Sequence, residues 1–155
     1  MEINDVKIRK ALTDDSFEIL RWRNDPETIK FSLGKKNVTL QEHEEWFRKT
    51  LKSRTNFIYV GTVNHLLVGV VRFANFQDKL NFKVSINISP ETRSIGLGFK
   101  LIDLAEQELM REVGSCTLTA IVLKINVRSL SFFSKCKYEL HSETEEKVEF
   151  RKILT

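Results

Sequence analysis

Apolar and polar residues alternate without interruption from Leu80 to Ile88, near the middle of the chain. A period of two is typical of a strand with one buried face, and Pro90 ends it because proline has no N–H to donate to a ladder. After a short turn the period becomes helical, with apolar or small residues at Gly98, Leu101, Ile102, Ala105 and Leu109. This stretch therefore predicts a strand, a tight turn and an amphipathic helix.

The apolar runs elsewhere predict the rest of a sheet. Short strands are expected over 6–12, 56–63, 66–76, 118–122 and 147–154, with a tight turn at 64–65. Strands and helices are mixed along the chain, and the sequence contains no repeat or low-complexity tract. The pattern indicates one mixed α/β domain over residues 1–155, built around a central sheet.

Two helices are expected between the first strand and the second. The first begins at Thr13 and ends before Pro26, since the residue before a proline avoids the helical region. The second begins after Thr39, which forms a capping box with Glu42. Their inward sides are expected to hold Phe17 and Leu20 in the first helix, and Leu40, Phe47 and Leu51 in the second.

Composition narrows the class of protein. The chain has 155 residues, 41% hydrophobic and 30% charged, which is typical of a globular domain. No segment is long enough to span a membrane, and the acidic start differs from a signal peptide, so a cytoplasmic protein is expected. The net charge of +4 would suit nucleic acid, but the basic residues are interleaved with 21 acids, which favours a mixed surface and no nucleic-acid partner. Two cysteines are too few for a zinc site or a disulfide framework, so no metal is expected.

The turn between the central strand and its helix is a candidate anion site. It reads Arg93-Ser94-Ile95-Gly96-Leu97-Gly98. A helix start attracts phosphate through its free N–H groups and its dipole, the glycines allow an anion to approach the backbone, and Arg93 is expected to add positive charge. The alternative is a tight connection without a ligand. The pattern fits neither the P-loop nor the dinucleotide fingerprint.

These residues resemble the coenzyme A pyrophosphate loop of the GNAT-type N-acetyltransferases. A second signature of that family is similar to the later series Asn126, Ser129, Phe133, Lys135 and Tyr138. The resemblance implies acetyl-CoA as co-substrate and a mostly antiparallel central sheet of about six to seven strands with about four flanking helices. It also implies that backbone groups of Ile86, Asn87 and Ile88 bind the pantetheine arm, with Asn126, Ser129 and Phe133 nearby.

The sequence departs from the family at two positions. Phe133 stands where many relatives have a tyrosine that protonates the leaving thiolate, and Lys137 stands where they usually have glycine. A phenyl ring cannot donate a proton, so water or another group does so, or the thiolate leaves unaided. These departures also motivate a different class of function, a module that binds coenzyme A without turnover.

The N-terminal part suggests the acceptor. Residues 22–27 and 42–47 resemble the amino-sugar acetyltransferases of pseudaminic acid synthesis, which implies a UDP-linked amino sugar as the acceptor amine. Enzymes that acetylate ribosomal-protein N-termini share part of this pattern, so a peptide amine is the alternative. The resemblance puts four residues on the acceptor side: Trp22, Arg23, Asn24 and His43. The oligomeric state stays open, and a homodimer is compatible with the sequence.

The catalytic residues are less defined. His43 is a candidate general base because imidazole titrates near neutrality, but its polar neighbours equally suit a solvated helix face. Asn126 is the other candidate, with a turn residue as the alternative. Positioning of the two substrates supplies much of the rate in such a transfer, so a dedicated base is not required.

Overall fold

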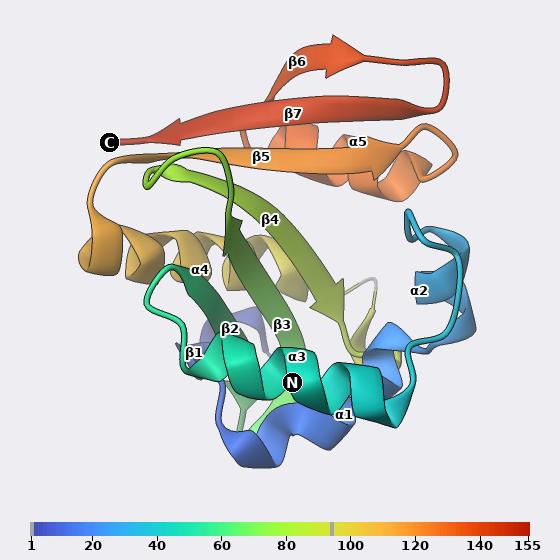
Figure 1. Cartoon of the computed structure of the whole chain (residues 1–155), viewed down its shortest axis with the longest axis vertical. Coiled ribbons are helices and arrows are strands. Elements are labelled where there is room, and N and C mark those ends of the chain that lie inside the picture. The colour runs from blue at the N-terminus through green and yellow to red at the C-terminus, as the bar shows by residue number, and fades with distance from the viewer. Residues whose placement is uncertain (1, 94) are drawn as a thin grey trace.

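Seven strands form one sheet in the order β1-β2-β3-β4-β5-β7-β6 in the computed structural model, which describes residues 2–93 and 95–155. Neighbouring strands are antiparallel except β4 and β5, which are parallel. This confirms the expected mixed, mostly antiparallel sheet (Figure 1). The strands are β1 Lys7–Lys10, β2 Asn56–Val63, β3 Leu66–Asn75, β4 Asn81–Ile88, β5 Cys116–Leu123, β6 Glu139–Glu143 and β7 Lys147–Leu154.

Helices cover both faces of the sheet. On one face, α1 and α3 pack over a cluster that includes Trp22, Phe47 and Val60. On the other, α4 and α5 pack over the larger cluster, which runs from Phe57 to Leu154 across the strands. The α-helices are α1 Ser16–Arg23, α2 Pro26–Lys30, α3 Leu40–Leu51, α4 Leu97–Val113 and α5 Val127–Lys135, and the short 3-10 turns are Ile3–Asp5, Thr13–Asp15 and Pro90–Thr92.

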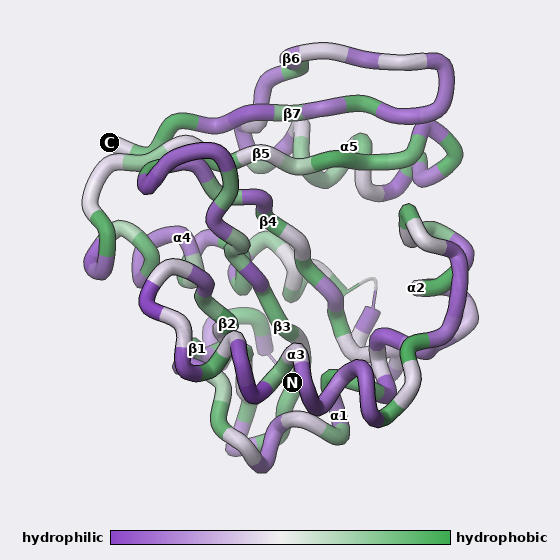
Figure 2. Tube along the Cα trace, in the orientation of Figure 1, coloured by the Kyte–Doolittle hydropathy of each residue, from purple (hydrophilic) through white to green (hydrophobic). Residues whose placement is uncertain are grey.

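The inward side of α1 differs from the expectation. Phe17 is 71% exposed, and Ile19 and Trp22 are the buried apolar residues. The helix begins at Ser16, after a 3-10 turn, so the pair three residues apart at 19 and 22 faces the sheet. In α3 the expectation holds for Phe47, whereas Leu40 is exposed because it is the first residue of the helix. Figure 2 shows most of α3 as hydrophilic, as befits a helix with one narrow buried side.

Two elements were not expected from the sequence. The short helix α2 begins at Pro26, and the side chain of Asp25 caps it by accepting from the N–H groups of Glu27 and Thr28. Strand β6 is exposed along its whole length and therefore has no apolar alternation. Among the described residues, no helix is long and apolar enough to cross a membrane.

Candidate functional site

The parallel strands β4 and β5 pair only at their beginning. Their register covers residues 81–83 of β4 and 117–119 of β5. Beyond these pairs the two strands diverge across the sheet (Figure 1). The rest of β4 keeps its pairing with β3, and the rest of β5 keeps its pairing with β7. The later parts of β4 and β5 therefore have no backbone pairing with each other, and this gap in the strand pairing is called the opening below.

The ladder with β3 decides which backbone groups of β4 face this opening. The N–H of Ser89 donates to the carbonyl of Val68 (2.9 Å), and the N–H of Phe76 donates to that of Asn81 (3.0 Å). In an antiparallel ladder the bonded pairs alternate, so odd-numbered residues of β4 turn their backbone groups toward β3. The even-numbered residues turn theirs toward the opening: Val84, Ile86 and Ile88.

This alternation corrects one expectation. Ile86 and Ile88 have backbone groups available in the opening, but Asn87 bonds to β3 through its backbone. The Asn87 side chain instead lies on the α2 side, where its Oδ1 accepts from Thr28 Oγ1 at 3.4 Å. On β5 the same reasoning, from the bond of Thr117 N–H to Leu80 O, leaves Ile121 and Leu123 facing the opening.

The start of α4 lies beyond the end of β4. Gly96 is the N-cap, with a positive φ of 84°, and no side chain caps the helix or adds an acid to its first turn. Leu97 packs into the core, whereas Ile95 is exposed. Ser94 lies outside the described residues. In the described part of the chain no side chain caps this helix start, and the anion site that the turn sequence predicts stays a prediction.

Gly98 has a second reason to be glycine. An ideal Cβ there would lie 3.0 Å from Cε2 of Phe132 on α5. The rings of Phe99 and Phe132 also lie close, with centroids 5.0 Å apart. The close approach of α4 and α5 thus depends on the missing side chain.

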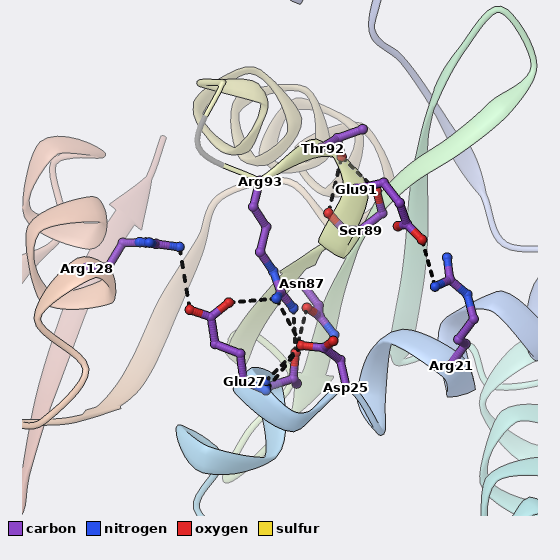
Figure 3. Close-up of polar contacts among 10 residues, drawn as sticks. Arg21, Asp25, Glu27, Asn87, Ser89, Glu91, Thr92, Arg93 and Arg128 are labelled. Atoms are coloured by element: carbon purple, nitrogen blue, oxygen red, sulfur yellow. Dashed lines mark hydrogen bonds and ion pairs between the residues drawn. The ribbon is translucent and has the colours of Figure 1, made fainter.

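Arg93 does not point toward the glycine turn. Its Nη1 donates to Asp25 Oδ2 (2.9 Å) and to Glu27 Oε2 (2.6 Å), and its Nη2 donates to Thr28 Oγ1 (2.9 Å). Figure 3 shows the guanidinium between the two carboxylates of the α2 region. Its charge is therefore already offset, which corrects the expectation that it adds free positive charge to the turn. It also holds the pKa of the Asp25 carboxyl below its ordinary value.

The α5 residues of the second signature have structural partners. Asn126 is the N-cap of α5, and its Oδ1 accepts from the N–H of Ser129 at 3.2 Å. Phe133 is 5% exposed and packs edge-on against Phe132 and Tyr138. It thus contributes to the core beside the opening. Lys137 has a φ of 70°, in the left-handed region that favours the glycine usual at this position.

The residues expected on the acceptor side fall into different roles. Trp22 is 0% exposed, so its indole supports that side from the core and does not line it. The amide of Asn24 bonds both backbone groups of Val38, at 2.8 and 2.7 Å. Asn24 therefore fixes the loop between α2 and α3. These two positions are corrections to the expectation, because packing and loop closure occupy both side chains.

His43 is neither a solvated residue nor an accessible base. It is 3% exposed, its Nε2 lies 3.0 Å from the carbonyl of Ser16, and its ring stacks on Phe47. A carbonyl only accepts, so Nε2 is assigned the proton. Burial lowers the pKa of His43 below its ordinary value, which keeps the imidazole neutral at pH 7.

Two partly buried arginines on the α1 side of the sheet have no carboxylate within 4.0 Å among the described residues. Arg23, at the end of α1, has a buried Nη1 without a hydrogen-bond partner in the part of the chain that is described. Arg72, on β3, donates from Nε to Ser85 Oγ (3.0 Å) and lies over the ring of Trp46. Arg72 was missed in the sequence, although a lone charge inside the apolar run of β3 is an unusual feature.

Comparisons with known proteins agree with this geometry. Residues 5–139 match the family model described as an acetyltransferase (GNAT) domain. No curated protein matches the chain.

Solved structures share the fold at low identity. A GNAT-family acetyltransferase from Streptococcus pneumoniae is 17% identical, with 97% of this chain and 99% of that chain covered and a TM-score of 0.77. The spermidine N-acetyltransferase from Vibrio cholerae, in complex with CoA and spermine, is 15% identical, with coverages of 97% and 96% and a TM-score of 0.86. The yncA structure from Salmonella typhimurium, with its cofactor acetyl-CoA, is 14% identical, with coverages of 96% and 94% and a TM-score of 0.78. The chain belongs to the GNAT family and is an acetyl-CoA-dependent N-acetyltransferase.

Proposed function

We propose that the protein acetylates the primary amine of a nucleotide-linked amino sugar, most simply a UDP-amino sugar. The observation that carries this proposal is the opening between β4 and β5, with an unpartnered arginine on the side that α1 and α3 cover. The likeness of residues 22–27 and 42–47 to amino-sugar acetyltransferases supports the sugar as acceptor. The opening itself supports the transfer and does not depend on the sugar.

The unpaired edge of β4 suits the polarity of the coenzyme A arm. Extended chains bind to free strand edges through main-chain hydrogen bonds, and the arm carries two amides that can do the same. Ile86 and Ile88 would bind this arm through their backbone groups. The uncapped start of α4 would hold the pyrophosphate through the N–H groups near Gly96 and Gly98. When bound, acetyl-CoA supplies the thioester whose acetyl group passes to the amine.

The described residues contribute mainly orientation to the transfer. His43 is buried and bonded, so it does not reach the amine, and Phe133 has no proton to donate. The amine must therefore arrive in its neutral form. Arg23 and Arg72 favour this form, because nearby positive charge lowers the pKa of an ammonium group. A thiolate is a good leaving group, so the absence of a phenol at 133 is tolerable.

Arg23→Ala tests the placement of the acceptor. We expect the KM for the UDP-amino sugar to rise about ten- to a hundredfold, as the loss of a charged hydrogen bond predicts, while the KM for acetyl-CoA hardly changes. Arg48→Ala is the matched control, since Arg48 is an exposed arginine on α3. An equal rise in KM for the acceptor and for acetyl-CoA would indicate that Arg23 supports folding. Faster acetylation of peptides than of every UDP-amino sugar would favour the peptide alternative.

A further inference from the structure

Arg72 is the only charged residue of β3. Its neighbours Val71 and Phe73 point into the core beneath α4. Side chains alternate along a strand, so Arg72 points to the opposite face, together with Val70, which packs in the cluster beneath α1 and α3. A long charged side chain is thereby placed between the sheet and its covering helices.

The contacts of Arg72 hold its guanidinium in place without neutralising it. Nε donates to Ser85 Oγ at 3.0 Å, and the guanidinium carbon lies 5.0 Å from the centre of the Trp46 ring. These contacts fix the plane of the group. Neither of its Nη atoms is used in them, so the two-pronged side that matches an oxyanion is left for a ligand.

Arg23 adds a second positive charge to the same region. Its Nη1 is buried without a hydrogen-bond partner. Burial, and then the charge of Arg23, lower the pKa of Arg72 to about 10, so the Arg72 guanidinium stays charged at neutral pH. Among residues 2–93 and 95–155, no carboxylate lies within 4.0 Å of either guanidinium.

This arrangement is unusual for the protein itself. Arg9, Arg21, Arg93, Arg111 and Arg151 are paired with acids, and two arginines without an acid within 4.0 Å in the described chain, Arg48 and Arg54, are exposed to solvent, whereas Arg23 and Arg72 are partly buried. A buried charge without a partner is unfavourable, and two of like sign are more so. An anionic ligand would remove this cost.

Arg72 is bonded to β4 next to the opening. Ser85, which holds Arg72, directly precedes Ile86, whose backbone groups face the gap between β4 and β5. Consecutive residues of a strand are about 3.3 Å apart. A group bound by Arg72 would thus lie close to the amine that reacts in the opening.

We infer that Arg23 and Arg72 form a subsite for one oxyanion group of the acceptor, either a phosphate or a carboxylate. The inference rests on the proposed acetyl transfer and deepens it by naming the acceptor class. The enzyme selects amines that carry an oxyanion and rejects polyamines, whose positive charges would meet two arginines. It differs in this respect from the spermidine N-acetyltransferase that shares its fold.

The subsite can be tested without knowing the acceptor. With coenzyme A saturating, so that the start of α4 is occupied, inorganic phosphate is added at about ten times its Kd, at an ionic strength matched with chloride. We expect the Tm of the wild type to rise by about 3–6 °C. We expect Arg72→Met and Arg23→Met to lose this rise and the control Arg48→Met to keep it. An equal rise in Arg72→Met would overturn the subsite, and an equal rise in Arg23→Met would do so if Arg72→Met does not fold.

Kinetics then separates the subsite from the transfer. The acceptors are a UDP-amino sugar, a peptide with an acidic second residue, the same peptide with a neutral residue, and spermidine. We expect kcat/KM for the UDP-amino sugar and for the acidic peptide to be at least ten times higher than for the neutral peptide and for spermidine. We expect Arg72→Met to abolish this preference and Arg72→Lys to restore part of it. Acetylation of all four amines at similar rates would overturn the subsite and leave the transfer standing. If phosphate raises the Tm as expected but none of the four amines is acetylated, the proposed transfer would be overturned and the subsite would stand.

Discussion

Gly98 shows at the scale of one residue how packing and binding can require the same small side chain. We expect Gly98→Asp to weaken coenzyme A binding by an order of magnitude or more. The new side chain would crowd Phe132 and put a negative charge at the helix start that phosphate requires. Titration calorimetry measures the affinity. Gly34→Asp adds the same charge where no atom lies within 4 Å of the new Cβ, and it should bind normally. Unchanged affinity in folded Gly98→Asp would exclude the turn as the pyrophosphate site.

His43 gives a prediction for stability against pH. Its folded pKa is lowered below the ordinary 6.5, so the unfolded chain binds the proton more readily. The stability that neutral His43 provides is therefore present above pH 6.5 and is lost as pH falls from there toward the folded pKa. The carboxyls of Asp15, Asp25 and Glu91 also have lowered pKa values, but these affect the stability of the fold only below about pH 4.5.

The comparison variant is His43→Gln, which can still donate to the Ser16 carbonyl. Urea unfolding between pH 7 and pH 5 should show a larger loss of stability for the wild type than for His43→Gln. An equal loss of unfolding free energy between pH 7 and pH 5 in the two proteins would show that His43 has the same pKa in the fold as in the unfolded chain.

At the scale of elements, α2 is held to the turn after β4 by Arg93. We expect Arg93→Met to lower the free energy of unfolding by roughly 1.5–3 kcal/mol, since it removes partly buried charged hydrogen bonds to Asp25 and Glu27. Arg128 is the matched control. Figure 3 shows that it also points toward Glu27. Its Nη1 lies 3.9 Å from Glu27 Oε1, and its side chain is exposed.

Arg128→Met should therefore change stability by less than about 0.5 kcal/mol. Denaturant midpoints of the three proteins provide the comparison. If the two variants lose the same stability, α2 is held by its own cap and not by Arg93.

Sequence patterning predicts the elements that have a clear period. The strand that ends at Ile88 and the helix that follows Gly96 bury one face each, so their apolar residues recur with a regular period in the sequence. α2 has no such hydrophobic period, because it has five residues and none of them is buried. The sequence pattern predicts only the end of α1 at this point, whereas Asp25 caps a new helix and Pro26 suits its first position.

The direction of a charged side chain is harder to predict. Arg93 stands beside the glycine turn in the sequence, yet it reaches acids nearly seventy residues away along the chain. Asn24 and His43 were assigned to the acceptor, whereas a backbone segment and a carbonyl from other parts of the chain bond them. Such partners become visible only when the fold brings them together.

At the scale of the whole molecule, β4 borders three regions: the core under α4, the opening, and the opposite face of the sheet. Its even-numbered residues turn apolar side chains to the core under α4 and backbone groups to the opening. Its odd-numbered side chains point to the face covered by α1 and α3, which we propose as the acceptor side, and there Ser85 accepts from Arg72 and Asn87 accepts from Thr28. One strand thus links the expected position of the acetyl donor to that of the acceptor, which explains how a transfer can proceed by alignment without a dedicated base.

The most direct test of this account is release of free thiol from acetyl-CoA by the purified protein with UDP-amino sugars, peptides and polyamines as acceptors. Acetylation of the sugar amine is confirmed by mass spectrometry. The account predicts thiol release that depends on the UDP-amino sugar and exceeds that with peptides or spermidine. Binding of coenzyme A without thiol release for any of these amines would contradict it.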